Sequence, residues 1–312
     1  MEQIEKGITI VITQNCNLKC KYCLRDNSYR INESFDIIEL RKILDTIQKH
    51  GYTTILTTGG EPFLVPHIVE YLEYLTAAGM KTLVESNGTL IDKNILGKIV
   101  TIKNYTKIHF LISLDHYLPE IHDYMRGKGS FQQAIKCIRL LTNHGFYIHT
   151  NRVFTPNTLI HDTDDLLKYL YLCEELKVNE VHFSKVVYTE NKHKKYALTK
   201  DQIVQIREII SNATHRLLDL NDCETLWRYA TKKYCPKIDR GAISISKNGI
   251  SPCNLIPDII LDSYENLENY LTSPKEYKFS SLRKKALQSW DEKYINCTDC
   301  GLLCRNLYRS DV

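Results

Sequence analysis

Short apolar runs alternate with longer stretches of helical periodicity along the first two thirds of the chain. In the first such stretch the apolar residues recur every three or four positions, as on one face of a helix; they are Ile37, Ile38, Leu40, Ile43, Leu44 and Ile47. The predicted strands are 7–13, 53–57, 82–85, 107–114, 147–154 and 180–187. The predicted helices are 36–50, 66–78, 92–100, 130–143, 163–176 and 199–210.

Consecutive strand–helix units require a parallel sheet that is covered by helices. The six units predicted here are fewer than the eight of a closed barrel. The expected fold is therefore α/β, a partial (β/α)6 TIM barrel over residues 1–215. An open, doubly wound sheet is the competing architecture. We favour the barrel because the unusual motifs follow strand ends, where barrel enzymes gather their chemistry.

The strand–helix rhythm stops near residue 215. Residues 222–233 are expected to form one more helix, 242–251 a hairpin turning at Asn248-Gly249, and part of 259–289 a helical stretch. These elements predict a second, small α+β domain over residues 216–312.

Composition narrows the functional classes. The 41 basic and 37 acidic side chains leave a net charge of +4, without the concentrated basic face that nucleic-acid binding requires. No segment has the ~18 apolar residues of a membrane helix, and the start of the chain has no signal-peptide pattern. We therefore expect a cytoplasmic protein whose eleven cysteines are metal ligands or free thiols.

Three of these cysteines lie within eight residues, directly after the first predicted strand: Cys16, Cys20 and Cys23. A cubane iron–sulfur cluster normally takes four cysteines. Three thiolates on one loop would leave one iron open, as in a catalytic rather than a structural metal site. The alternatives are a three-thiolate zinc site and three unrelated thiols.

A second motif, Thr58-Gly59-Gly60-Glu61-Pro62, follows the second predicted strand. Two adjacent glycines allow a ligand to approach the backbone closely. The carboxylate of Glu61 is then available for an ammonium group of that ligand.

With these two motifs the sequence resembles the radical S-adenosylmethionine superfamily. Further motifs continue the resemblance in the same order over the first 215 residues; they are Glu85-Ser86-Asn87-Gly88, Ser113-Leu114-Asp115 and Met125-Arg126-Gly127-Lys128-Gly129-Ser130. The family has glycine where His116 stands, and we expect a solvated histidine there, or else a ring that faces substrate.

The resemblance implies that Cys16, Cys20 and Cys23 hold a 4Fe–4S cluster whose open iron binds the amino and carboxylate groups of S-adenosylmethionine. The residues that would contact this cofactor are Tyr22 at the adenine, Gly59, Gly60 and Glu61 at the amino group, Ser113 and Arg126 at the carboxylate and ribose, and Asn87 nearby. Reductive cleavage would give a 5′-deoxyadenosyl radical that abstracts a substrate hydrogen, with flavodoxin or ferredoxin as electron donor. For Arg126 the alternative is a surface arginine on a flexible glycine-rich loop.

Five cysteines near the end of the chain resemble the SPASM and twitch extensions of the same superfamily. The resemblance implies one auxiliary 4Fe–4S cluster on Cys235, Cys253, Cys297 and Cys300, for any of which Cys304 could substitute. Taken by themselves these spacings fit a structural zinc site equally well. The remaining cysteines are predicted to be core residues (Cys137 and Cys173) or a candidate hydrogen-atom donor (Cys223).

The leading functional hypothesis is an enzyme that modifies a ribosomally made peptide by cross-linking, thioether formation, epimerisation or oxidation. The alternative is a dehydrogenase or epimerase of a sugar or aminocyclitol. A third hypothesis is a metal-binding module without catalytic activity.

Overall fold

The computed structural model describes residues 6–23, 33–186, 193–218, 243–251 and 260–272. They form one sheet of eight strands in the order β6-β5-β4-β3-β2-β1-β7-β8. The strands are β1 (Lys6–Thr13), β2 (Tyr52–Gly59), β3 (Lys81–Ser86), β4 (Ile108–Ser113), β5 (Ile148–Phe154), β6 (Glu180–Lys185), β7 (Ser244–Ser246) and β8 (Gly249–Ser251). The α-helices are α1 (Ile37–Lys49), α2 (Ile68–Ala77), α3 (Lys93–Ile99), α4 (Pro119–Arg126), α5 (Ser130–Thr142), α6 (Thr163–Glu175), α7 (Lys200–Asn212) and α10 (Leu267–Thr272).

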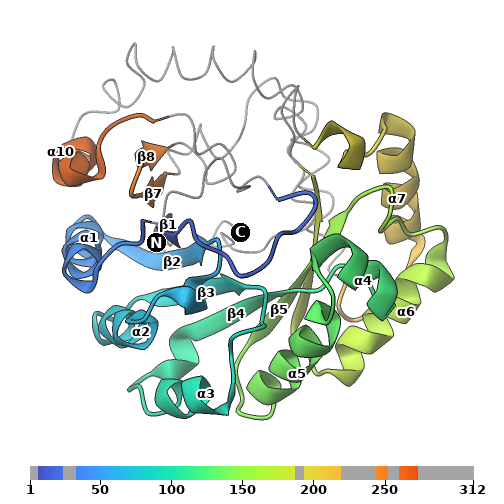
Figure 1. Cartoon of the computed structure of the whole chain (residues 1–312), viewed down its shortest axis with the longest axis horizontal. Helices are drawn as coiled ribbons and strands as arrows, with labels where there is room; N and C mark the ends of the chain where they lie inside the picture. Colours follow the sequence, from blue (N-terminus) through green and yellow to red (C-terminus); the bar gives the residue numbers. More distant parts are fainter. Residues whose placement is uncertain (1–5, 24–32, 187–192, 219–242, 252–259, 273–312) are drawn as a thin grey trace, which may run out of the picture.

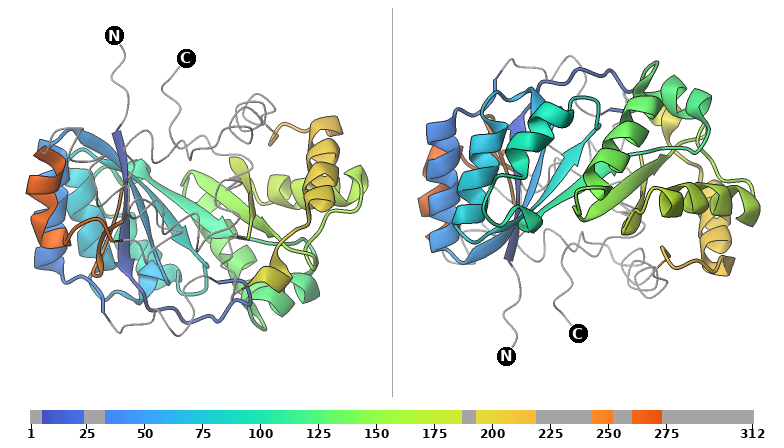
Figure 2. Two further views of the ribbon diagram at one scale, coloured as in Figure 1. Left: turned by 90° about the horizontal axis from the view of Figure 1, so that it is seen from above. Right: turned by 90° about the horizontal axis from the view of Figure 1, so that it is seen from below.

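Strands β1 to β6 are parallel, and each pairs with the next one along the chain. Among the described strands β6 pairs only with β5, and β8 only with β7, so the sheet is not closed. Figure 1 shows helices α1, α2, α3, α5 and α6 around the outside of the curved sheet, and the two views of Figure 2 agree. The predicted partial barrel is confirmed.

Three details differ from the sequence prediction. Helix α4 was not predicted, although Pro119 begins it and Gly127, with φ +135°, ends it. The hairpin turns at Lys247 and Asn248, one residue earlier than expected. Its first strand, β7, pairs in parallel with β1 and so extends the barrel sheet. The predicted helix 222–233 lies outside the described residues, whereas α10 falls within the predicted helical stretch 259–289.

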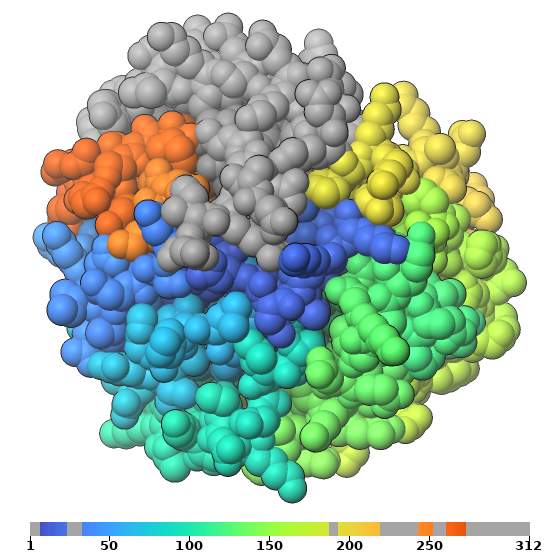
Figure 3. Space-filling view, viewed as in Figure 1, coloured from blue at the N-terminus to red at the C-terminus, as the bar shows by residue number. Residues whose placement is uncertain are grey.

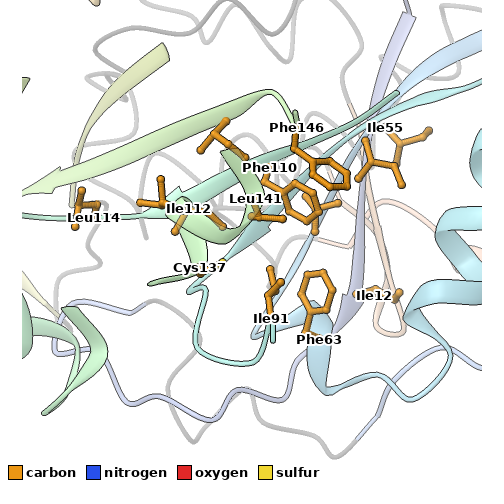
Figure 4. Close-up of a cluster of buried hydrophobic side chains, with 14 of the residues drawn as sticks. Ile12, Ile55, Phe63, Ile91, Phe110, Ile112, Leu114, Cys137, Leu141 and Phe146 are labelled. Carbon is orange, nitrogen blue, oxygen red and sulfur yellow. The ribbon is translucent and has the colours of Figure 1, made fainter. Parts of the chain in front are cut away.

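The main core lies between the sheet and the helices. Figure 4 shows Phe63, Phe110 and Phe146 packed there among aliphatic side chains. The stacked pair Phe63–Phe110 and the edge-to-face pair Phe110–Phe146 fill the space between strand β4 and its neighbours. Cys137 and Cys173 are buried in this core as free thiols, as predicted.

The opposite face of the sheet carries a smaller apolar cluster of Leu56, Leu83 and Leu111. Alternate residues of a strand point to opposite faces, so this cluster lines the inside of the partial barrel. Among the described helices none is both long and apolar enough to cross a membrane.

Candidate functional site

The cysteine loop follows β1 at the carboxyl edge of the parallel strands. Cys16, Cys20 and Cys23 are half-buried on this loop, and none of them is in a disulfide. The amide of Cys23 donates to the carbonyl of Cys20 (3.1 Å), and the amide of Lys21 donates to the carbonyl of Met125 in α4 (2.9 Å). In Figure 3 the dark blue segment that contains the loop reaches the surface between the cyan and green parts of the chain.

The electrostatics of the loop suit a cationic cluster. Burial is the main reason that the pKa of Cys20 is raised to about 12; negative charge on Cys23, Asp115 and Cys16 acts in the same direction, and the charge of Arg126 opposes them. The Cys20 thiol therefore resists becoming a thiolate unless a nearby cation compensates the charge. Iron ions bind thiolates and supply that compensation. The residues present fit a 4Fe–4S cluster.

The two glycines at the end of β2, Gly59 and Gly60, make room for the backbone of this loop. The amide of Gly60 donates to the carbonyl of Thr13 (2.9 Å), and that of Glu61 to the carbonyl of Asn15 (2.7 Å). A Cβ atom on Gly59 would lie 2.5 Å from the Thr13 oxygen, and one on Gly60 only 2.1 Å from the Asn15 oxygen. The close approach predicted for these glycines is thus found, but the approaching group is the start of the cysteine loop.

The carboxylate of Glu61 lies inside the protein, with none of the residue exposed. It accepts hydrogen bonds from the amides of Phe63 (3.1 Å) and Asn87 (2.8 Å) and from the hydroxyl of Ser86 (2.9 Å). Burial raises its pKa to about 7, although these hydrogen bonds oppose the shift. Glu61 therefore ties the end of β2 to the end of β3. This placement differs from the expectation that its side chain faces a ligand ammonium group.

Asn87 belongs to a closed ring of side-chain hydrogen bonds beside the first cysteine. Its Nδ2 donates to Oδ1 of Asn17 (2.9 Å), Nδ2 of Asn17 donates to Oγ1 of Thr89 (2.7 Å), and Oγ1 of Thr89 donates to Oδ1 of Asn87 (2.6 Å). Nδ2 of Asn87 also lies 3.8 Å from Sγ of Cys16. The ring links the cysteine loop to the loop after β3; sequence analysis missed Asn17 and Thr89 because nothing in their spacing marks them.

Replacing Thr89 with valine should loosen this ring. The change removes a hydroxyl that both donates and accepts, at a cost of about 1–2 kcal/mol in the free energy of unfolding. We expect the variant to lose iron to a chelator faster than the wild type does, since Asn87 then holds Cys16 less firmly. The matched control is Thr101→Val, because the Thr101 hydroxyl donates to the nearby carbonyl of Lys98, far from the cysteine loop in sequence. Equal rates of iron loss in the two variants would contradict this role.

A buried ion pair lies next to the cysteine loop. Nε and Nη2 of Arg126 donate to Oδ2 (2.8 Å) and Oδ1 (2.9 Å) of Asp115, and the Tyr22 hydroxyl donates to Oδ2 (2.5 Å). Arg126 is 8% exposed and Asp115 is not exposed. Although burial opposes it, the guanidinium holds the pKa of Asp115 below its usual value, and the carboxylate raises that of Arg126. Arg126 is thus not a surface arginine, and sequence analysis gave no role to its partner Asp115.

Helix α4 brings Arg126 to this position, and Asp123 holds the helix in place. The Asp123 carboxylate accepts from the amides of Gly129 (2.6 Å) and Phe131 (2.8 Å) at the start of α5. The last turn of α4 is therefore fixed beside Cys20, whose Sγ lies 3.9 Å from the carbonyl oxygen of Arg126.

The end of β4 supplies Ser113 and, three residues later, His116. Ser113 is half-buried on the edge of the sheet that also carries the cysteine loop. His116 is 3% exposed, so the expected solvated histidine is wrong. Its Nδ1 accepts from the amide of Leu118 (3.0 Å), and its ring stacks on Tyr117. Burial, aided by the charge of Arg152, lowers its pKa to about 4, so the ring is neutral.

Six cysteines whose roles were predicted from the sequence lie outside the described residues: Cys223, Cys235, Cys253, Cys297, Cys300 and Cys304. The auxiliary cluster and the hydrogen-atom donor assigned to them therefore stay predictions.

The family of the chain follows from a match over the segment that builds this site. Residues 10–170 match the family model described as Radical SAM superfamily, and this is more than half of the chain. The chain belongs to the radical SAM superfamily. The match begins in β1 and includes the cysteine loop, the glycine pair and the segments that contain Asp115 and Arg126, and all of these lie in motifs on which the sequence resemblance rests.

Several characterised relatives share this part of the chain. The antilisterial bacteriocin subtilosin biosynthesis protein AlbA of Bacillus subtilis is 30% identical over 84% of this chain and 59% of its own length. The mycofactocin maturase MftC of Mycolicibacterium smegmatis is 30% identical over 47% of this chain and 38% of its own. The chain thus spans less than two thirds of these relatives.

Solved structures confirm the fold. Streptococcus suis SuiB superposes with a TM-score of 0.66 at 17% identity, over 88% of this chain and 67% of that one. The structure titled anSMEcpe with bound AdoMet gives a TM-score of 0.70 at 17% identity, over 96% of this chain and 88% of that one.

Proposed function

We propose that this protein is a radical SAM enzyme that modifies a ribosomally made peptide. The observation that carries the proposal is the placement of three half-buried thiols on one loop at the carboxyl edge of a partial barrel. Barrel enzymes bind substrate and perform chemistry at that edge. A metal-binding module without catalytic activity has no need of a fourth, open position there.

Cys16, Cys20 and Cys23 would hold a 4Fe–4S cluster, and the position they leave open would take S-adenosylmethionine. When bound, this pair supplies a 5′-deoxyadenosyl radical, the species that removes a hydrogen atom from the substrate. The protein positions and shields the reacting groups. For this it offers a loop that is fixed from two sides, by the amides of Gly60 and Glu61 at the end of β2 and by the last turn of α4.

Ser113, Arg126, Asn87 and the backbone around Gly59 and Gly60 are the proposed contacts of the cofactor. Arg126 presents Nε and Nη2 to Asp115, which leaves Nη1 as the nitrogen for a ligand carboxylate. The ion pair thereby sets the orientation of the guanidinium before any ligand binds. Tyr22 packs beside it, with the Arg126 guanidinium carbon 5.5 Å from the centre of the ring, and its backbone would meet the adenine.

The further parts of the proposal concern the end of the chain and its partners. One auxiliary 4Fe–4S cluster would be bound by Cys235, Cys253, Cys297 and Cys300, with Cys304 as a possible substitute. A flavodoxin or ferredoxin would deliver the electron. Because the protein has a net charge of +4, it should attract such an acidic electron donor weakly. We expect the protein to work in the cytoplasm.

A peptide substrate is favoured by the relatives. AlbA, by its name, takes part in the biosynthesis of a bacteriocin, and MftC is a maturase. SuiB has been solved with the precursor peptide SuiA, in a structure that superposes on 96% of this chain with a TM-score of 0.62. A small molecule is the second candidate, because an AdoMet-dependent heme synthase of Oleidesulfovibrio alaskensis is 29% identical over 57% of the chain. A sugar or aminocyclitol substrate belongs to this second class.

The substrate class can be tested by stimulation of cofactor cleavage. Reconstituted protein is incubated anaerobically with S-adenosylmethionine, a reductant and either synthetic precursor peptides or amino sugars. We expect peptides to raise the rate of 5′-deoxyadenosine formation by about tenfold, because bound substrate completes the site. Deuterium placed on peptide carbons should then appear in the 5′-deoxyadenosine. Stimulation by amino sugars alone would contradict a peptide substrate and leave the family assignment intact.

A further inference from the structure

Two neighbouring strands bring three potential metal ligands together at the amino-terminal end of the barrel. Nδ1 of His149 in β5 lies 2.9 Å from Nε2 of His182 and 3.2 Å from Oε2 of Glu180, both in β6. Nε2 of His182 lies 3.6 Å from the same carboxylate oxygen. One donor atom from each side chain therefore converges on a single point.

The cluster points into the barrel, at the rim opposite the cysteine loop. Thr150, the neighbour of His149, contacts Cys173 and Tyr169 of α6, so His149 must project from the other face of the sheet. Phe183, the neighbour of His182, packs against Tyr169 and is likewise on the helix side. His149 and Glu180 occupy the second and first positions of their strands, whereas the cysteines follow the last residue of β1.

A proton shared between the two rings accounts for only part of this arrangement: one ring nitrogen can donate to the other across 2.9 Å, but the nitrogen without a hydrogen then also faces the carboxylate oxygen. If Nδ1 of His149 and Nε2 of His182 both carry a hydrogen, two N–H groups whose nitrogens are 2.9 Å apart point at the same carboxylate oxygen. If either lacks a hydrogen, its lone pair faces the carboxylate across 3.2 or 3.6 Å. A cation that accepts a lone pair from each of the three atoms removes both conflicts.

The burial of His149 points in the same direction. Its side chain is 7% exposed, and its Nε2 is buried without a hydrogen-bond partner among the described residues. The ring thus leaves one nitrogen unsatisfied in order to keep the other in the cluster. A buried nitrogen without a hydrogen bond raises the free energy of the folded state, and a strong contact at Nδ1 would offset that cost.

The donor set and its spacing match a zinc site. Two imidazoles and one carboxylate form a known zinc ligand set, and bonds of about 2.0–2.1 Å place neighbouring tetrahedral ligands roughly 3.3–3.4 Å apart. The three separations found here lie on both sides of that value. The Tyr147 hydroxyl donates to the other oxygen of Glu180 (2.6 Å), the kind of second contact that orients a metal-binding carboxylate.

We propose that His149, Glu180 and His182 bind one Zn²⁺ ion, with water in the fourth position. The ion would join β5 to β6, which is an edge strand among the described residues. An edge strand lacks a pairing partner on one side, and a metal bond to its neighbour holds its amino-terminal end in the sheet. The site is separate from the cysteine loop, so this proposal does not depend on the proposed function.

The test measures zinc and iron in the same protein. Cluster-reconstituted full-length protein is equilibrated with zinc sulfate, desalted and analysed by mass spectrometry of the metals. We expect about one zinc per chain in the wild type and loss of that zinc in Glu180→Gln and His182→Gln, with the iron content unchanged. The control is His109→Gln, because the His109 ring stacks near His149, 5.8 Å away, without belonging to the ligand set; it should keep the zinc.

X-ray absorption at the zinc edge of the wild type makes the test independent of how the variants fold. Nitrogen and oxygen neighbours at about 2.0–2.1 Å, with no sulfur shell near 2.3 Å, are expected. A sulfur shell would show that zinc occupies cysteines and would overturn the proposal, as would a wild type that retains no zinc. Zinc should also raise the melting temperature of the wild type by about 3 °C or more, and an equal rise in Glu180→Gln would count against the site.

Discussion

Gly60→Ala protein should fail to assemble its iron–sulfur cluster. The new Cβ atom would lie 2.1 Å from the carbonyl oxygen of Asn15, so the loop that carries Cys16 must move away from β2. That movement breaks the bond from the Gly60 amide to Thr13 and shifts the cysteines relative to one another. We expect iron per chain to fall close to zero after reconstitution and the free energy of unfolding to fall by about 1–3 kcal/mol.

The control for this variant is Gly97→Ala. Gly97 lies in α3, and a Cβ atom there meets no heavy atom within 4 Å. Alanine in a helix is favoured over glycine, so the control should be as stable as the wild type or more stable by about 0.5–1 kcal/mol. Normal iron content in Gly60→Ala would show that the close approach of the two loops is unnecessary for the site.

Asp115→Asn should be the most destabilising single change near the site. It leaves the guanidinium of Arg126 buried without a countercharge, and it replaces the acceptor of the Tyr22 hydroxyl. Breaking a buried ion pair by removing one partner costs about 3–5 kcal/mol. Denaturant unfolding of the apoprotein measures this loss. The control is Asp45→Asn, because Asp45 also accepts a tyrosine hydroxyl, that of Tyr74, but at the surface.

The pH dependence of the Asp115 effect has a definite sign. Since the folded state holds its pKa below the ordinary value of 3.8, the unfolded state binds more protons as the medium becomes acidic. The ionised Asp115 carboxylate therefore stabilises the folded state above pH 3.8, and this contribution is lost as the pH falls towards the pKa that Asp115 has in the folded state. The gap in stability between the wild type and Asp115→Asn should narrow over that range. A double variant that also replaces Arg126 with glutamine should recover part of the loss, and strict additivity would contradict the pairing.

The regular part of the fold was predictable from sequence because each element carries its own signal. The buried strands are β-branched runs, and α1 places Leu40, Ile43, Leu44 and Ile47 on one buried face. Helix α4 lacks such a signal, since its buried residues are His122, Met125 and Arg126. Burial of a charged residue depends on a partner from another element, here Asp115, and sequence spacing does not reveal that partner.

The site was predictable to the extent that its residues are close in sequence. The cysteine spacing alone indicated the metal loop. The roles of Glu61 and Asn87 depend on how the ends of β2 and β3 meet. There the Glu61 carboxylate accepts hydrogen bonds from the backbone amides of Phe63 and Asn87. Strand β7 has only three residues, and its parallel pairing with β1 brings together segments more than 200 positions apart. Such long-range contacts leave no local pattern in a single sequence.

Cleavage of S-adenosylmethionine is the most direct test of the proposed radical chemistry. Anaerobically reconstituted wild type, given S-adenosylmethionine and a strong reductant, should form 5′-deoxyadenosine, and Cys20→Ala should form none because the cluster loses one of its three ligands on the loop. A wild type that contains at least one intact 4Fe–4S cluster yet releases no 5′-deoxyadenosine with any peptide or small molecule supplied, or a Cys20→Ala variant as active as the wild type, would contradict the account.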